Sequence, residues 1–304
     1  MFYRRALVSK RFPIVCRNGG NCSKCRYCRY QRCIQSGIGI PPGQLISNQP
    51  TLSSIIQQLN NLDINRKHTF QNFIVAQDFD LKNCVLPEYF HYMKKPANLN
   101  LEYLDWVITS QATCIDYIRN MKLFDGLSTQ EQFDFVRLSI MPYILFSVAM
   151  YSYSNRIEYN AYPGGIDALP DSLVKHYEQC PAILNNIRCP LVAKLRELNV
   201  TNEEFLLLSA IILCNFGSTN FSESTRGLLK KYQDTYTSSL FQYCLNTYQQ
   251  SGPSRLSDLL SIIYVIGKTF EKYVSAQMMH RESVMEPVLA PENFYEPAVE
   301  NMMK

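Results

Sequence analysis

The sequence predicts an all-α domain that makes up most of the chain and follows a short cysteine-rich segment. Apolar residues recur at spacings of three and four from about residue 52 onward, which is the period of one face of an α-helix. The chain has 304 residues, of which 46% are hydrophobic and 18% are charged, a composition typical of a globular protein with a sizeable core. Five of the 11 cysteines fall within residues 16–33. We therefore expect a small N-terminal module over 1–36, a hinge over 37–50 and a helical domain over 51–304.

The N-terminal module is strongly basic although the chain as a whole is nearly neutral. Residues 1–33 hold nine Lys or Arg and no acidic residue, whereas the formal net charge of the chain is +4. Subtracting these nine from the totals of 30 basic and 26 acidic residues leaves 21 basic and 26 acidic side chains in the rest. A basic segment on a mildly acidic body is expected of a protein that contacts nucleic acid or another anionic surface.

Cysteines in the module have the spacing of a structural zinc site. Cys25 and Cys28 form a C-x2-C pair, and five residues separate Cys16 from Cys22. Four thiolates close a tetrahedral shell around Zn²⁺, so we predict that these four cysteines bind zinc. The module has no apolar core, and zinc binding, worth ~10 to 16 kcal/mol in zinc-finger peptides, would supply its folding energy. An odd cysteine count in a long chain without a signal peptide favours reduced thiols in a nuclear or cytosolic protein.

Basic residues interleaved with the cysteines are the candidate contacts to DNA. Each phosphate that such a residue neutralises adds about 0.9 to the slope of log affinity against log salt concentration. The candidate DNA-binding residues are Arg4, Arg5, Lys10, Arg11, Arg26, Arg29 and Arg32.

Two other interpretations of the module stay open. In the first, the segment is a disordered basic tail whose cysteines are incidental. In the second, Cys22, Cys25, Cys28 and Cys33 hold an iron–sulfur cluster, since their C-x2-C-x2-C-x4-C spacing is close to the C-x2-C-x2-C-x3-C-P run of bacterial clusters. The last gap is one residue too long and the proline is absent, so zinc is favoured.

Residues 37–50 have the composition of a hinge. Glycines and prolines punctuate the stretch from Gly37 to Gly43, and a polar run then ends at Pro50. The G-x-G pattern inside this stretch also occurs in phosphate-binding loops. No strand precedes it, and Pro41 and Pro42 stand where a helix would have to begin. A linker is therefore favoured over a phosphate site.

Apolar stripes and capping signals predict the helices of the domain. The stripes cover 52–62, 101–118 and 256–273. Two capping boxes, Ser128 with Glu131 and Thr201 with Glu204, predict the starts of two further helices. The apolar residues that follow each box suit helices buried on most sides. Counting these patterns, we expect roughly eight to eleven helices.

The remaining patterns exclude several other classes of protein. The most apolar runs, 139–151 and 205–216, are shorter than the ~18 to 20 residues of a membrane span, so we predict no membrane contact. Residues 156–169 break the helical pattern and predict a short hairpin or irregular turn. No H-E-x-x-H or G-x-S-x-G motif is present, so no enzyme is predicted. The histidines are scattered, at His68, His91, His176 and His280.

Two motifs in the chain have a specific pattern. After Cys16 and Cys22, the run Cys25-Arg-Tyr-Cys28-Arg-Tyr-Gln-Arg-Cys33-Ile-Gln-Ser-Gly37 matches C-R-x-C-R-x-x-K/R-C-x-x-x-G. The stretch 123–132, together with Arg137, is close to F-x-x-L-x-x-x-D-Q-x-x-L-L-K, with Glu in place of Asp. Both motifs resemble the nuclear hormone receptor family, and the sequence over 147–154 is similar to its expanded nematode branch. Residues 2–8 resemble the middle of the family's DNA-reading helix.

The resemblance implies a truncated zinc-finger module followed by a helical ligand-binding domain in a nuclear protein. The first finger of the family is expected to be missing, since its four cysteines would precede Phe2. The second finger is shortened between Cys22 and Cys25. In the family, an apolar pocket takes a lipophilic ligand, a C-terminal helix completes a groove for coregulators, and receptors pair as homodimers or heterodimers.

The resemblance also assigns residues to the coregulator groove. By position, Arg119 and Arg137 match its basic residues. Glu300, in a short helix that Pro297 would open, is the candidate acidic residue. The alternative for the two arginines is that they are solvated cations at helix ends, since surface arginine is common.

Two functions agree with these observations. The first is a nuclear-receptor-type transcription factor, with zinc-dependent DNA binding and ligand-regulated control of transcription. The alternative is a DNA-binding-deficient, receptor-like interaction protein that titrates partner receptors or coregulators. The missing first finger distinguishes the two functions. A DNA-binding module with only its second finger is expected to bind DNA weakly, with strong salt dependence and almost no sequence preference.

Overall fold

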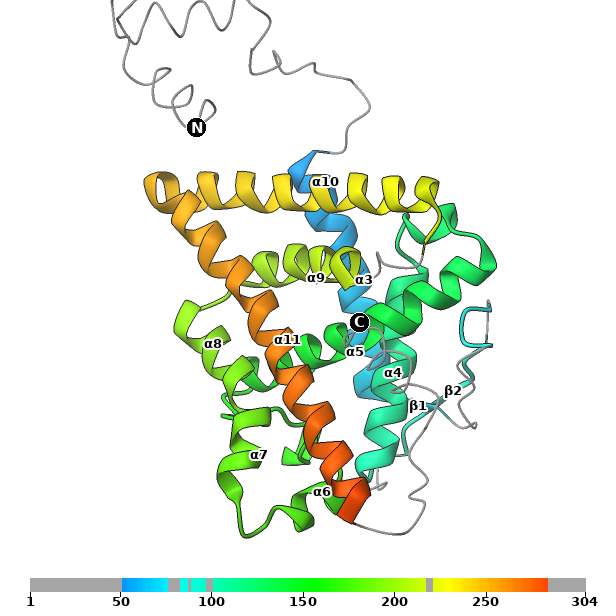
Figure 1. The fold of residues 1–304 in the computed structure, drawn as a ribbon. Helices are drawn as coiled ribbons and strands as arrows, with labels where there is room; N and C mark the ends of the chain where they lie inside the picture. Colours follow the sequence, from blue (N-terminus) through cyan, green and yellow to red (C-terminus); the bar gives the residue numbers. More distant parts are fainter. Residues whose placement is uncertain (1–50, 76–82, 87–88, 97–100, 217–220, 284–304) are drawn as a thin grey trace, which may run out of the picture. The chain divides into compact units, whose positions relative to one another are not determined.

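The computed structural model describes residues 51–75, 83–86, 89–96, 101–216 and 221–283 (Figure 1). Within these residues the chain forms nine α-helices and two short strands, so the predicted all-α class of the domain is confirmed. The four predicted zinc ligands, the seven candidate DNA-binding residues and Glu300 lie outside the described residues.

The helices and strands carry the labels of Figure 1. The helices are α3 (Leu52–Asn72), α4 (Tyr103–Arg119), α5 (Thr129–Ser154), α6 (Asp171–His176), α7 (Pro181–Arg188), α8 (Pro190–Leu198), α9 (Asn202–Phe216), α10 (Glu223–Tyr248) and α11 (Gly252–Ser283). The strands are β1 (Phe73–Val75) and β2 (Tyr92–Lys94).

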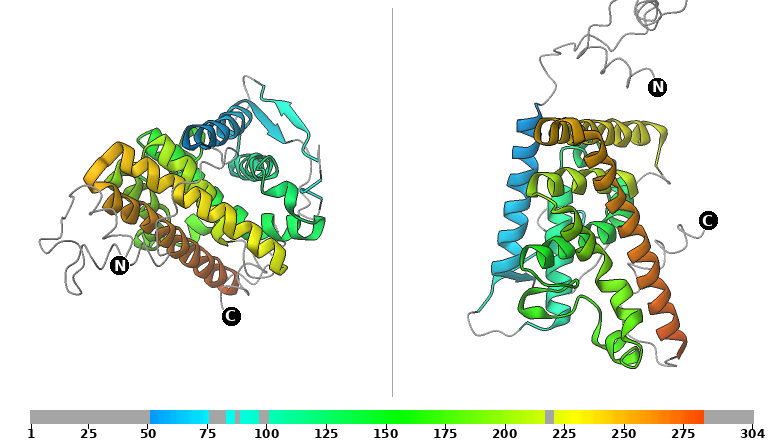
Figure 2. Two further views of the ribbon diagram at one scale, coloured as in Figure 1. Left: turned by 90° about the horizontal axis from the view of Figure 1, so that it is seen from above. Right: turned by 90° about the vertical axis from the view of Figure 1, so that its left-hand side faces the viewer.

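The helices stack in three layers (Figure 2). α3 packs on α4 at one side, α5, α8 and α9 form the middle, and α10 packs on α11 at the other side. α9 contacts both α3 and α10, whereas α11 also contacts α5, α7 and α8. Helices α5 and α9 of the middle layer are covered on two sides, which is why their sequences are apolar on most faces.

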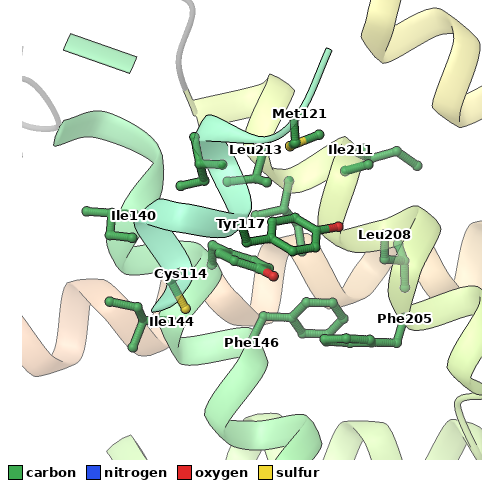
Figure 3. Packing of buried hydrophobic residues seen from close by; sticks show 14 of the residues in the cluster. Cys114, Tyr117, Met121, Ile140, Ile144, Phe146, Phe205, Leu208, Ile211 and Leu213 are labelled. Carbon is green, nitrogen blue, oxygen red and sulfur yellow. The ribbon is translucent and has the colours of Figure 1, made fainter. Parts of the chain in front are cut away.

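The centre of the core lies where α4, α5 and α9 meet (Figure 3). Phe146 of α5 packs against Phe205 of α9 with ring centroids 5.0 Å apart, and Tyr117 of α4 lies at the same distance from Tyr143 of α5. Fully burying one such side chain stabilises the fold by ~1.5 to 3 kcal/mol. The first of these contacts holds together two helices that are far apart in the sequence, and the second joins two consecutive helices.

α5 begins at the predicted capping box. The backbone N–H of Glu131 donates to Oγ of Ser128 at 3.4 Å, and the backbone N–H of Ser128 donates to Oε2 of Glu131 at 3.1 Å. The helix then continues through Pro142 to Ser154, beyond the apolar run seen in the sequence. Among the described residues, α5 alone is long and apolar enough to cross a membrane, but 72% of its most apolar stretch is buried inside the domain. It packs as a core helix.

The second predicted capping box also forms, and it joins α9 to α11. The backbone N–H of Thr201 donates to Oε2 of Glu204 at 2.9 Å, and the backbone N–H of Glu204 donates to Oγ1 of Thr201 at 3.3 Å. The fully buried carboxylate of Glu204 also accepts hydrogen bonds from Arg255 at 2.6 and 2.7 Å. Bidentate charge-assisted bonds of this kind are strong, so they fix the start of α11 against α9.

A small antiparallel sheet departs from the all-helical sequence prediction. β1 and β2 pair Phe73 with Lys94 and Val75 with Tyr92. Strands of three residues show too little alternation to be recognised from periodicity. The sheet lies beside the C-terminal end of α3 and against α4 (Figure 1).

The predicted interruption at 156–169 is an irregular turn. An isolated bridge joins Ala161 to Asp167, and a turn of 3₁₀-helix spans Pro163–Gly165 between them. Gly164 and Gly165 have φ angles of 79° and 78°, in the left-handed region that favours glycine. The turn brings its flanking residues against the core.

Candidate functional site

A small cavity lies between α4, α5, the turn at 156–169, α7 and α11, and is called the inner cavity below. Its volume is about 50 Å³, far below the ~300 to 1,000 Å³ of typical ligand pockets. Apolar side chains dominate its wall. The lining residues are Tyr103, Val107, Gln111, Met141, Ile144, Leu145, Val148, Asn160, Tyr162, Ala168, Leu169, Ile187, Arg188 and Tyr273.

Polar groups converge on the inner cavity from three elements. Gln111 of α4 and Asn160 of the turn are both buried, Asn160 with 3% of its surface exposed. Among the described residues, Oδ1 of Asn160 has no hydrogen-bond partner. Arg188 of α7 pairs with Asp167, and its guanidinium lies 5.1 Å from the ring centroid of Tyr159. A buried acceptor without a donor is uncommon in folded proteins, so the inner cavity has a position that a ligand donor would satisfy.

The tyrosines of the inner cavity supply hydroxyl groups rather than charges. Burial raises the pKa of Tyr103 and of Tyr162 well above the ordinary value, because the phenolate would lose its hydration. Both phenols are therefore neutral at physiological pH. With mostly apolar side chains and few charges, the inner cavity suits an apolar molecule with one or two polar groups.

Arg119, a predicted groove residue, lies at the last position of α4 beside a different cavity. Its Nη1 donates to Oδ1 of Asp116 at 3.0 Å, and the hydroxyl of Tyr92 donates to Oδ2 of Asp116 at 2.5 Å. Burial raises the pKa of Asp116, although the bond from Tyr92 acts in the opposite direction. These three residues line a cavity of about 390 Å³ between α3, α4 and β2, called the outer cavity below.

Arg137, the second predicted groove residue, lies in α5. Its Nη2 donates to Oδ1 of Asp134 at 3.3 Å, and its buried Nε has no partner in the described part of the chain. Arg137 lines neither the inner nor the outer cavity, so neither brings it together with Arg119. The exposed fractions of the two side chains are only 15% and 14%. Neither arginine is a freely solvated cation, and their role in coregulator binding stays a prediction.

The polar residues of the inner cavity were not recognised from the sequence. Gln111 interrupts a buried helix face, and Asn160 directly precedes the Pro-Gly-Gly turn region, but isolated polar residues of this kind are common. Their grouping depends on contacts between segments far apart in the chain. Among the described residues, no group of three His, Cys, Asp or Glu side chains could hold a metal ion.

The sequence of the chain is similar to that of a known protein family. A family model described as the ligand-binding domain of nuclear hormone receptor matches residues 90–278, a range that includes every residue lining the inner cavity. The chain is 33% identical over 279 residues to nuclear hormone receptor family member nhr-27 of Caenorhabditis elegans, covering 89% of this chain and 78% of that protein. Two further relatives of the same organism are nhr-167, 32% identical over 90% and 83% of the two chains, and nhr-9, 30% identical over 89% and 81%.

Proposed function

Because the chain belongs to the nuclear hormone receptor family, on its nematode branch, we propose that it is a transcription factor that binds DNA through a zinc module and responds to a small lipophilic ligand. Receptors of this family are not enzymes, and we propose no catalytic activity. The nucleus is the proposed location.

The observation that carries ligand control is the lining of the inner cavity. Its wall is mostly apolar, and the unpartnered Oδ1 of Asn160 provides one acceptor for a ligand hydroxyl or amide. The remaining volume of about 50 Å³ means that a ligand has to displace side chains as it enters. Met141 is suited to such movement, since its unbranched thioether side chain adopts several shapes at low cost.

The DNA-binding part of the proposal rests on the residues of the module itself. Four thiolates from Cys16, Cys22, Cys25 and Cys28 form a donor set that fits a tetrahedral zinc ion. Zinc would order the segment so that its basic side chains face DNA phosphates. We also propose that coregulators bind the helical domain near Arg119, Arg137 and Glu300, and that a partner receptor forms a homodimer or heterodimer.

A fluorescent fatty alcohol tests ligand binding in the inner cavity. cis-Parinaryl alcohol has a hydroxyl donor and no charge, it fluoresces strongly in an apolar site, and we expect the full chain to bind it. The substitution Ala168→Leu adds three carbon atoms to the wall of the inner cavity and should weaken binding at least about tenfold, since it fills the space that the ligand needs. The matched variant Ala193→Leu, at an exposed position of α8, should leave binding unchanged. Equal binding by all three proteins would exclude the inner cavity as the ligand site.

Salt-dependent gel shifts test the DNA-binding part. If Arg29 and Arg32 each contact a phosphate, replacing both with Gln should reduce the slope of log affinity against log salt by about 2. The control Lys230→Gln with Lys231→Gln removes two exposed charges from α10 and should not change the slope. One zinc ion per chain in elemental analysis, lost in Cys25→Ser, would support the module. Zinc-free protein with an unchanged gel shift would contradict it and favour the basic-tail interpretation.

A further inference from the structure

A third cavity opens beside the C-terminal half of α3 and is called the basic cavity below. Its volume is about 240 Å³, nearly five times that of the inner cavity. Residues of α3, α4, α5 and the turn at 156–169 line it. Because a water molecule occupies ~30 Å³, this space holds a small organic molecule without any rearrangement.

The lining of the basic cavity contains two cations and no carboxylate. The cations are Arg66 and Lys67, at successive positions of α3. Both pair with the buried Asp63: Nη2 of Arg66 lies 2.7 Å from Oδ1, and Nζ of Lys67 lies 2.6 Å from Oδ2. Asp63 itself does not line the cavity. Two positive charges share one negative charge, so the group carries one unit of positive charge in excess next to the cavity.

The remaining wall has the features of a site for an amphipathic molecule. Phe70, Val148 and Tyr162 provide an apolar surface. Ser147, with 5% of its surface exposed, lines the same cavity, and among the described residues its Oγ has the Cys114 thiol as a neighbour but no nitrogen or oxygen hydrogen-bond partner. A hydroxyl placed in this way can donate to an anionic oxygen.

We propose that the basic cavity binds a small organic monoanion, a carboxylate with a compact apolar body. The carboxylate lies against Arg66 and Lys67, and the apolar body covers Phe70 and Tyr162. A single carboxylate neutralises the excess charge, whereas a dianion such as phosphate brings more charge than the site offers and has no apolar part. The outer cavity is also lined by Arg66, but there Arg119 pairs with the carboxylate of Asp116 in the same wall, so Lys67 is the cation that distinguishes the basic cavity.

The chain contains its own reporter for this site. Trp106 is its single tryptophan, and its ring lies 5.2 Å from Phe70 and stacks on Tyr162 at 6.5 Å. Both neighbours line the basic cavity. A molecule that settles on these rings should change the emission of Trp106, so binding can be followed without a label.

Cyclohexanecarboxylate is the probe that tests the proposal with the full chain. It is transparent where tryptophan is excited, and titration calorimetry can confirm the stoichiometry. We expect it to bind with a dissociation constant of about 1 mM or lower. Its uncharged amide should bind at least about tenfold more weakly, because charge-assisted hydrogen bonds are lost. Acetate, which lacks the apolar body, should also bind at least about tenfold more weakly.

A pair of matched lysine variants locates the site. Lys67→Met should weaken binding of the carboxylate at least about tenfold. Lys268→Met is the control, because the two lysine side chains are similarly exposed, at 43% and 47%. Each also pairs with one carboxylate and lies within 6 Å of one aromatic ring centroid. Arg66 is left intact, since its removal would leave Asp63 buried without its main partner.

Three results would overturn the proposal: equal binding of the acid and its amide, unchanged binding by Lys67→Met, or equal losses in both lysine variants. Ala168→Leu, which alters only the inner cavity, should not affect the carboxylate. Failure of this proposal is therefore distinguishable from failure of ligand binding in the inner cavity.

Discussion

The inner cavity and the basic cavity share a wall but differ in how much space they keep. Val148 and Tyr162 line both of them. The inner cavity is lined mostly by apolar side chains, which gain dispersion energy by closing onto one another, and about 50 Å³ remains. The basic cavity is lined by Arg66 and Lys67, whose charged groups would lose further hydration if its walls closed, and about 240 Å³ remains. Charge alone does not set the volume, because the cation Arg188 lines the inner cavity.

The largest expected effect comes from removing the negative charge behind the basic cavity. Asp63→Asn leaves Arg66 buried without a charged partner, and breaking a buried ion pair from one side costs about 3 to 5 kcal/mol of unfolding free energy. Urea unfolding measures this loss. Asp234→Asn, which breaks the exposed intrahelical pair with Lys230 in α10, is the control and should cost less than about 1 kcal/mol. Equal losses of unfolding free energy in the two variants would show that the buried pair between Asp63 and Arg66 contributes no more to stability than the control ion pair.

A smaller effect is expected from truncating a residue of the inner cavity. Met141→Ala removes a buried side chain and should lower the free energy of unfolding by about 2 to 3 kcal/mol. The same change enlarges the cavity, so cis-parinaryl alcohol should bind more tightly. Met279→Ala, at an exposed position of α11, should change stability by less than about 0.5 kcal/mol. If Met141→Ala lowers stability without improving binding, the inner cavity does not limit ligand size.

The smallest expected effect concerns the N-terminus of α5, a helix that lines both cavities. Hydrogen bonds from Thr225, Ser128 and Ser222 lower the pKa of Glu131 from 4.5 to about 2. The carboxylate therefore contributes stability above about pH 4.5, and this contribution is lost as the pH falls from 4.5 towards 2. Because Glu131 is at the surface, the contribution should stay below about 1 kcal/mol.

Urea midpoints of the unchanged protein and of Glu131→Gln, measured from pH 7 to pH 3, test this effect. The two proteins should differ most at pH 7 and converge on acidification. A constant difference across the range would mean that the Glu131 charge contributes nothing. Binding at both cavities should be unaffected, which would show that they are independent of how α5 begins.

Local signals in the sequence predicted much of the fold. The apolar stripe at 52–62 and the boxes at Ser128 and Thr201 each mark a helix whose start the structure reproduces, because capping depends on residues three positions apart. The helices α6, α7 and α8 were not individually predicted, since they are at most nine residues long and a short stretch gives too few repeats of the helical period to be recognised.

The candidate site was less predictable for a physical reason. Asn160 and Gln111 line the same cavity only because the turn at 156–169 folds back on α4 and α5. Asp63, Arg66 and Lys67 are spaced as an ordinary solvated helix face, and nothing in their spacing indicates that Asp63 is buried. Burial of a charge is set by tertiary packing, which the local pattern does not contain.

The shared wall also makes the two cavities thermodynamically interdependent. Tyr162 lines both, so a molecule that shifts this side chain in one cavity changes the free energy of binding in the other. Linkage requires this change to be equal in both directions. Measuring the affinity of each ligand in the presence and absence of the other gives this coupling energy. Repeating the measurement on Tyr162→Phe, which keeps the ring and removes the hydroxyl, shows how much of the coupling energy depends on that hydroxyl.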